Sequence, residues 1–89
     1  MNEEKMQAIY KAALPGFYTD ARGAYGIVIG RVYICCFIND DGMYDVTVDT
    51  VDENGNFALN IDWESFNTPT EAISQLRHKL KHFVQLPQD

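Results

Sequence analysis

The feature that most constrains the fold is a run of strand-like segments between residues 25 and 66, separated by glycine turns. The stretch from Tyr25 to Ile38 is rich in Ile, Val, Tyr and Phe, a composition typical of β-strands. Gly30 interrupts it, which predicts a bulge, a bend or a break. Asp41-Gly42 and Asn54-Gly55 follow, and such pairs favour hairpin turns because their residues accept positive φ. We therefore expect three or four antiparallel strands.

The two turns also predict how the strands pair. A three-residue loop over Asp40-Asp41-Gly42, ending in a left-handed glycine, gives the pairs Ile38 with Tyr44, Cys36 with Val46, and Ile34 with Val48. A two-residue turn at the same place would shift this register by one residue. A two-residue turn at Asn54-Gly55 gives the pairs Val46 with Trp63, Val48 with Ile61, and Thr50 with Leu59. The predicted turns agree with the alternation of apolar and polar residues. One face then carries four apolar side chains: Val46, Val48, Ile61 and Trp63.

A helix is expected at each end of the chain. Apolar residues recur every three or four positions from about Glu3 to Leu14, and Pro15-Gly16 would end that helix. Thr68-Pro69-Thr70-Glu71 begins the second helix with a threonine N-cap, a proline at the first helical position and a glutamate at the third. The sequence thus predicts one α+β domain over residues 1–89, ordered helix, three or four antiparallel strands, helix, with both helices packed on one face of the sheet.

The middle of the chain is acidic. The protein has a net charge of -6, and no Lys or Arg lies between Val32 and Leu76. In the predicted pairing the face away from the helices carries Asp45, Thr47, Asp49, Asn60, Asp62 and Glu64, and the turns add Asp40, Asp41, Asp52 and Glu53 at the rim. This face is either a solvated, solubilising surface or a docking surface for a basic partner. A calcium site over 39–42 is a weaker alternative, because the terminal Glu of a calcium-binding loop is missing.

The leading hypothesis from the sequence is a small, acidic, non-enzymatic protein-interaction protein. Its expected partner is a protein with a basic surface, and one form of the hypothesis is an inhibitor that imitates nucleic acid and occupies the basic site of a nucleic-acid-binding protein. The expected partner-binding residues are Asp40, Asp41, Asp45, Asp49, Asp52, Glu53, Asp62 and Glu64. Direct binding to nucleic acid or to anionic membranes is not expected, because the net charge opposes it.

The alternative hypothesis is a homodimeric module without a function related to nucleic acid. From Val32 to Ile38 both faces of the predicted strand are apolar, which is typical of a strand covered on both sides. A second copy of the chain would supply one cover, and the expected dimer seam is Tyr33, Cys35 and Phe37.

No catalytic motif, cofactor motif or metal-binding motif emerges from the sequence. His78 and His82 have the spacing of two zinc ligands on a helix, but the neighbouring lysines would repel a cation. Cys35 and Cys36 are adjacent, so they point to opposite faces of a strand and are expected to be buried, reduced thiols. The longest apolar run is too short to span a bilayer. We expect no enzymatic activity, no cofactor, no bound metal and a cytoplasmic location.

Overall fold

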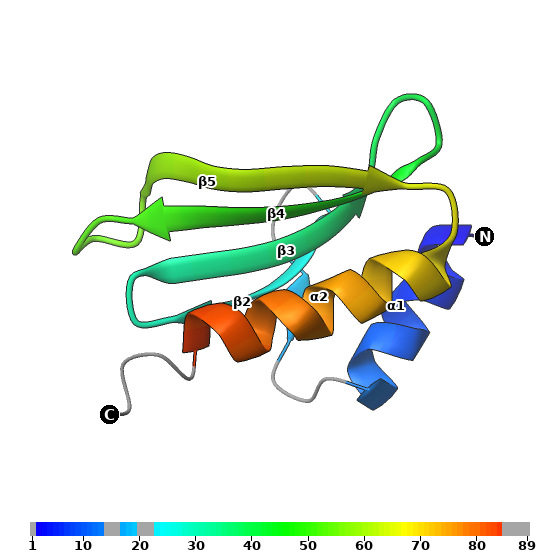
Figure 1. The fold of residues 1–89 in the computed structure, drawn as a ribbon, viewed down its shortest axis with the longest axis horizontal. Coiled ribbons are helices and arrows are strands. Elements are labelled where there is room, and N and C mark those ends of the chain that lie inside the picture. The colour runs from blue at the N-terminus through cyan, green and yellow to red at the C-terminus, as the bar shows by residue number, and fades with distance from the viewer. Residues whose placement is uncertain (1, 14–16, 20–22, 85–89) are drawn as a thin grey trace.

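The computed structural model describes residues 2–13, 17–19 and 23–84. Its elements are α1 (Asn2–Ala13), β1 (Tyr18–Thr19), β2 (Tyr25–Ile29), β3 (Val32–Ile38), β4 (Tyr44–Val51), β5 (Phe57–Phe66) and α2 (Pro69–Val84). The strands form one antiparallel sheet in the order β1-β2-β3-β4-β5, with a helix before and after it in the chain (Figure 1). The α+β class is confirmed, and the sheet has more strands than expected because the stretch around Gly30 forms two strands and β1 adds a short one.

The first turn of α2 follows its local sequence. Thr68 caps α2: its Oγ1 accepts a hydrogen bond from the Glu71 amide at 3.2 Å and donates one to the Glu71 carboxylate at 3.0 Å. Pro69 is the first residue of α2, as the N-cap motif predicts. The predicted end of the first helix, at Leu14 and Pro15-Gly16, lies outside the described residues.

The two long hairpins use the same three-residue loop. In the β3–β4 loop the Asn39 side chain accepts hydrogen bonds from the amides of residues 41 and 43, and Gly42 has φ 79°. In the β4–β5 loop the Asp52 side chain does the same for the amides of residues 54 and 56, and Gly55 has φ 84°. Of the two loop lengths considered for the first loop, the three-residue loop is confirmed. The predicted two-residue turn at Asn54-Gly55 is wrong, because Asp52 stabilises a longer loop.

The pairing of β3 with β4 is as predicted, whereas the pairing of β4 with β5 changes along the strand. Thr50 lies opposite Leu59 as expected, but register shifts occur on either side of this region. Ile61 is an extra residue in β5, so Val48 pairs with Asp62 and Thr47 pairs with Trp63. A one-residue shift moves each following side chain to the other face of the sheet. The predicted positions of Ile61 and Trp63 in the core are therefore wrong, and both side chains are exposed.

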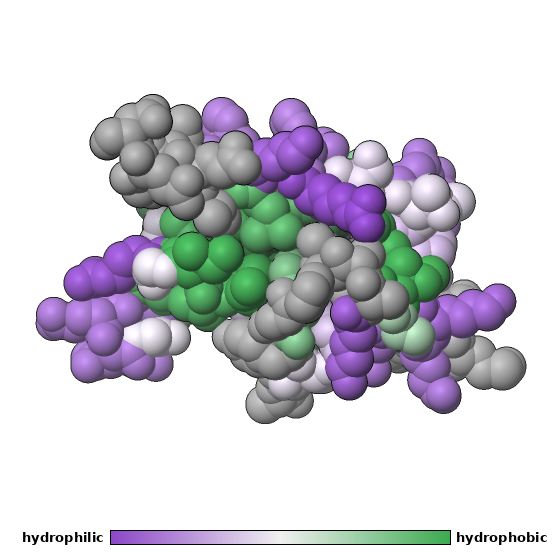
Figure 2. All heavy atoms as spheres, turned by 90° about the horizontal axis from the view of Figure 1, so that it is seen from below, coloured by the Kyte–Doolittle hydropathy of each residue, from purple (hydrophilic) through white to green (hydrophobic). Residues whose placement is uncertain are grey.

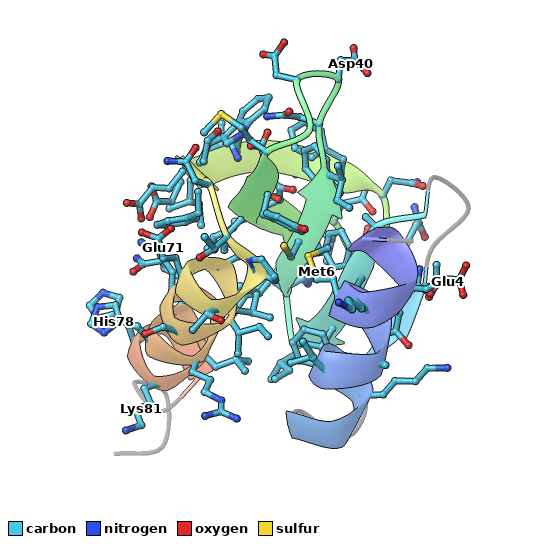
Figure 3. All side chains as sticks on the ribbon, turned by 90° about the vertical axis from the view of Figure 1, so that its right-hand side faces the viewer. Glu4, Met6, Asp40, Glu71, His78 and Lys81 are labelled. Carbon is cyan, nitrogen blue, oxygen red and sulfur yellow. The ribbon has the colours of Figure 1, made fainter. Side chains whose placement is uncertain are left out.

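The core lies between the sheet and the helices. It contains Ile34 and Cys36 of β3, Val46 and Val48 of β4, Ala72, Ile73 and Leu76 of α2, and Met6 of α1. Figure 3 shows Met6 pointing toward the sheet, with both helices on the same side of it. The Cys36 thiol lies 3.7 Å from the Met6 sulfur. We call the opposite side of the sheet the open face.

Candidate functional site

The open face has an apolar hollow with a volume of about 430 Å³. Its walls come from four strands and from the β4–β5 turn: Val28, Tyr33, Phe37, Thr47, Asp49, Val51, Gly55, Phe57, Asn60 and Trp63. A concave apolar surface with a few polar groups is the usual form of a binding site. The hollow is therefore the strongest candidate for a functional site in the described part of the chain.

Trp63 is held in a fixed orientation although its side chain is 60% exposed. Its indole Nε1 donates a 2.9 Å hydrogen bond to Oδ2 of Asp45. Its ring meets the ring of Phe37 edge to face, with centroids 6.4 Å apart and an interplanar angle of 62°. An exposed tryptophan whose polar end is already bonded presents a large apolar surface at little entropic cost.

Asp45 fixes this arrangement from below. It is 1% exposed, and its Oδ1 accepts hydrogen bonds from Asn39 Nδ2 at 2.9 Å and from Ser65 Oγ at 2.6 Å. With the indole of Trp63, three uncharged donors therefore satisfy the carboxylate. Asp45 was predicted as an exposed partner-binding residue, and the structure places it under the open face.

Tyr33 lies close to the backbone of Gly26 in β2, which stands opposite Cys35 in β3. A Cβ atom at Gly26 would lie 2.6 Å from Cε1 of Tyr33 and 2.7 Å from Cβ of Cys35. The buried Cys35 thiol lies 3.0 Å from the Thr47 hydroxyl. Of the predicted seam, Tyr33 and Phe37 line the hollow and Cys35 lies beneath it.

Asp62 and Glu64 lie on the helix side of the sheet, where Lys79 pairs with both. The hydrogen bond from Lys79 outweighs partial desolvation and lowers the pKa of Asp62 from its ordinary value. Burial acts to lower the pKa of Lys79, but its bonds to Asp62 and Glu64 prevail and raise it. Gln75 also donates a 2.9 Å hydrogen bond to Glu64. These two carboxylates are thus separated from the open face.

The remaining predicted acidic residues do not form a row. Asp49 lines the hollow and accepts a 2.7 Å hydrogen bond from Asn60. Asp40 and Asp41 lie in the β3–β4 turn, whose tip points away from the helices (Figure 3), while Asp52 and Glu53 lie in the β4–β5 turn. Figure 1 shows these two turns at opposite ends of the sheet. The acidic groups therefore frame the ends of the open face and do not cover it.

The helix side has a second groove, of about 470 Å³, between α1 and α2. Its lining residues are Ile9, Thr70, Ile73, Ser74, Arg77, His78 and Lys81. His78 and Lys81 point outward, away from the sheet (Figure 3). Figure 2, a view of the helix side, shows an apolar area among hydrophilic side chains. The hollow on the open face is the stronger candidate of the two, because its lining is mostly apolar and contains the fixed, exposed Trp63.

Neither a metal site nor a membrane span is found in the described parts of the chain. Over residues 2–13, 17–19 and 23–84, no three His, Cys, Asp or Glu side chains are grouped to hold a metal ion. No helix in these ranges is both long and apolar enough to cross a membrane.

The sequence prediction missed Val28, Phe57 and Trp63 as parts of the hollow. Simple alternation along β5 places Phe57 and Trp63 on the helix side, and only the irregular pairing moves them to the open face. The sequence held one signal that could have indicated them: the segment that forms the edge strand β5 has an excess of large apolar residues.

Comparisons with protein-family models, with curated proteins and with solved structures found no match to this chain.

Proposed function

We propose that the protein is a small protein-interaction protein without catalytic activity, and that it binds a segment of another protein on the open face. The observation that carries this proposal is Trp63, which is largely exposed and yet fixed by Asp45 and Phe37. Oriented tryptophans at the centre of an apolar patch are typical hot spots of protein interfaces. Both helices lie on the other side of the sheet (Figure 3), so the open face is the side on which we propose that the partner binds.

The proposed partner segment carries an apolar side chain next to Lys or Arg. The apolar side chain fills the hollow, and the basic side chain meets Asp49 or the carboxylates of the two turns. The segment from Val32 to Leu76 contains no Lys or Arg. No basic side chain of that segment therefore competes with a partner for these carboxylates. Such complementarity raises the association rate and disfavours acidic partners.

A partner that binds nucleic acid fits this chemistry, because its groove supplies Lys and Arg. We retain the inhibitor hypothesis in that form, with contacts now centred on the hollow and with Asp40, Asp41, Asp52 and Glu53 at its ends. Face-to-face pairing of two open faces is the competing proposal, since Tyr33 and Phe37 line the hollow. Face-to-face pairing would also bring Asp49 of each copy near the carboxylates of the other copy, and this repulsion is unfavourable.

The direct test is a fluorescence titration, because Trp63 is the only tryptophan. The probe is a set of extended peptides that alternate Leu or Phe with Lys, and the control set replaces each Lys with Glu. We expect the Lys peptides to shift the emission of Trp63 to shorter wavelength, with an affinity that falls as salt rises. Equal binding of both sets, or binding of neither, would refute the proposal.

Two matched variants locate the binding surface. Val28 lines the hollow and is 41% exposed, while Ile9 lies on the helix side and is 42% exposed. Val28→Ser should weaken binding about fivefold through the loss of buried apolar surface, and Ile9→Ser should leave it unchanged. Equal effects of the two substitutions would place the binding surface elsewhere.

A further inference from the structure

The outer edge of β5 carries more exposed apolar surface than any other strand in the described chain. Phe57 is 66% exposed, Leu59 63%, Ile61 45% and Trp63 60%. β5 pairs only with β4, so its other edge has no neighbouring strand in the described sheet. Long edge strands with apolar side chains are templates for pairing with another chain.

The first half of β5 is also uncovered by the helices. α2 begins three residues after β5 ends, and Figure 1 shows that it runs from that end of β5 obliquely across the sheet toward β2. The hydrogen bonds and ion pairs that α2 makes with β5 in the described chain come from Gln75 and Lys79 and reach Glu64 and Asp62, in the second half of β5. Leu59, opposite Thr50 on the helix side, therefore stays exposed.

We propose that a second copy of this chain covers the edge, with the two β5 strands pairing antiparallel about a two-fold axis close to Asn60. This register places Phe57 of one copy opposite Trp63 of the other and Leu59 opposite Ile61. Phe57 and Trp63 both lie on the open face, as directly opposed residues in an antiparallel pair must. Phe57 and Trp63 of the two copies thus meet on the open face.

The area and the charges fit a dimer of this kind. The four exposed side chains offer roughly 450 Å² of apolar surface per copy, and the backbone edge with its smaller side chains adds to this. A standard interface buries about 800 Å² per partner. With the axis at Asn60 only residues 57–63 of β5 pair, so we expect a smaller interface and a weak dimer that depends on protein concentration. In the proposed register Asp62 lies opposite Ala58 and Glu64 opposite Asn56, so no two carboxylates face each other across the axis.

The dimer goes beyond the proposed partner binding and does not depend on it. Because the two sheets would join edge to edge, the open faces of both copies would form one continuous surface. Phe57 of each copy would extend the hollow beside Trp63 of the other. The competing arrangement is a monomer, in which the register shifts of β5 blunt the edge against pairing.

Sedimentation equilibrium tests the dimer, with Leu59→Lys as the disrupting variant and Ile9→Lys as the matched control. Leu59 does not line the hollow, so this substitution separates dimerisation from partner binding. We expect a concentration-dependent dimer, weakened at least about tenfold by Leu59→Lys and unchanged by Ile9→Lys. A wild-type protein that stays monomeric at every concentration would overturn the proposal, as would a dimer that Leu59→Lys leaves intact.

A cysteine at the axis tests the register. Asn60→Cys should form a disulfide-linked dimer on mild oxidation, because directly opposed residues across an antiparallel pair are close enough for a disulfide. Ser74→Cys, on the exposed surface of α2, should remain unlinked. If Ser74→Cys links and Asn60→Cys does not, the edge pairing is refuted. Val28→Ser, which tests partner binding, should leave the dimer unchanged. Failure of the dimer proposal and failure of the proposed partner site therefore give different results.

Discussion

Replacing Asp45 by Asn should release Trp63 while keeping most of the carboxylate's other bonds. Oδ1 of Asp45 accepts from Asn39 and Ser65, whereas Oδ2 accepts only from the indole of Trp63. An asparagine with its oxygen in the Oδ1 position keeps the first two bonds. Its amide nitrogen then faces the indole N–H, and two donors cannot bond to each other.

The magnitudes differ between two substitutions at this position. Asp45→Ala removes all three bonds, and each bond to a charged group contributes about 1.5–3 kcal/mol. Because Trp63 and Ser65 are exposed and Asn39 is half-buried, water replaces part of the loss, and we expect about 2–4 kcal/mol of destabilisation. Asp45→Asn should cost about 1 kcal/mol, since it keeps two bonds and buries no charge.

Urea unfolding followed by tryptophan fluorescence measures both effects in one experiment. For Asp45→Asn we expect a small loss of stability together with greater acrylamide quenching and lower anisotropy of Trp63 in the folded state. Asp40→Asn is the control, because it removes the same charge from an exposed turn. The reasoning fails if Asp45→Asn destabilises as much as Asp45→Ala, or if it leaves the quenching and anisotropy of Trp63 unchanged.

Two further predictions concern the sheet and its ion pair. Gly26→Ala should destabilise the fold by about 1–3 kcal/mol, measured by urea unfolding, because its Cβ would lie 2.6 Å from the Tyr33 ring and 2.8 Å from the Ile34 carbonyl oxygen. Asp62 has a lowered pKa, so its pairing with Lys79 stabilises the fold above about pH 4 and the effect is lost as the pH falls through the folded-state pKa. Lys79→Met should therefore make the acid loss of stability shallower in unfolding experiments across that pH range, while Lys81→Met should not.

For the first long hairpin the sequence left two turn lengths open, and the structure confirms the three-residue loop, the one that agrees with the apolar pattern of the two strands. Asn39 and Gly42 require a three-residue loop, and that loop aligns Cys36 with Val46 and Ile34 with Val48. The second loop has the same chemistry, with Asp52 in the place of Asn39 and Gly55 in the place of Gly42. The Asn54-Gly55 pair favoured a shorter turn and hid this correspondence, which could have been recognised from the side-chain acceptor three residues before each glycine.

The extra residues of β5 could not be predicted from the sequence. Phe57, Leu59, Ile61 and Trp63 stand at alternate positions, and regular alternation is typical of a strand with one apolar face. The structure breaks this alternation at two places. The local sequence of β5 does not favour a break in the alternation at either place, so the irregular pairing of β5 with β4 reflects the packing of the whole sheet. Of the open face, the sequence therefore identified Tyr33, Phe37, Thr47, Asp49 and Asn60 and missed Phe57 and Trp63 of β5.

The same irregularity links the acidic composition to the proposed surface. With a regular β5, Trp63 would be buried under the helices and Asp62 and Glu64 would face outward beside Asp45. The shift at Ile61 exchanges the two sets: Lys79 takes up Asp62 and Glu64 on the helix side, and Trp63 moves over Asp45 on the open face. A carboxylate that would have added to an exposed acidic row thereby becomes the acceptor that orients an exposed tryptophan. The sequence suggests that the acidic residues themselves form the binding surface. At Asp45 the carboxylate instead supports an apolar binding surface.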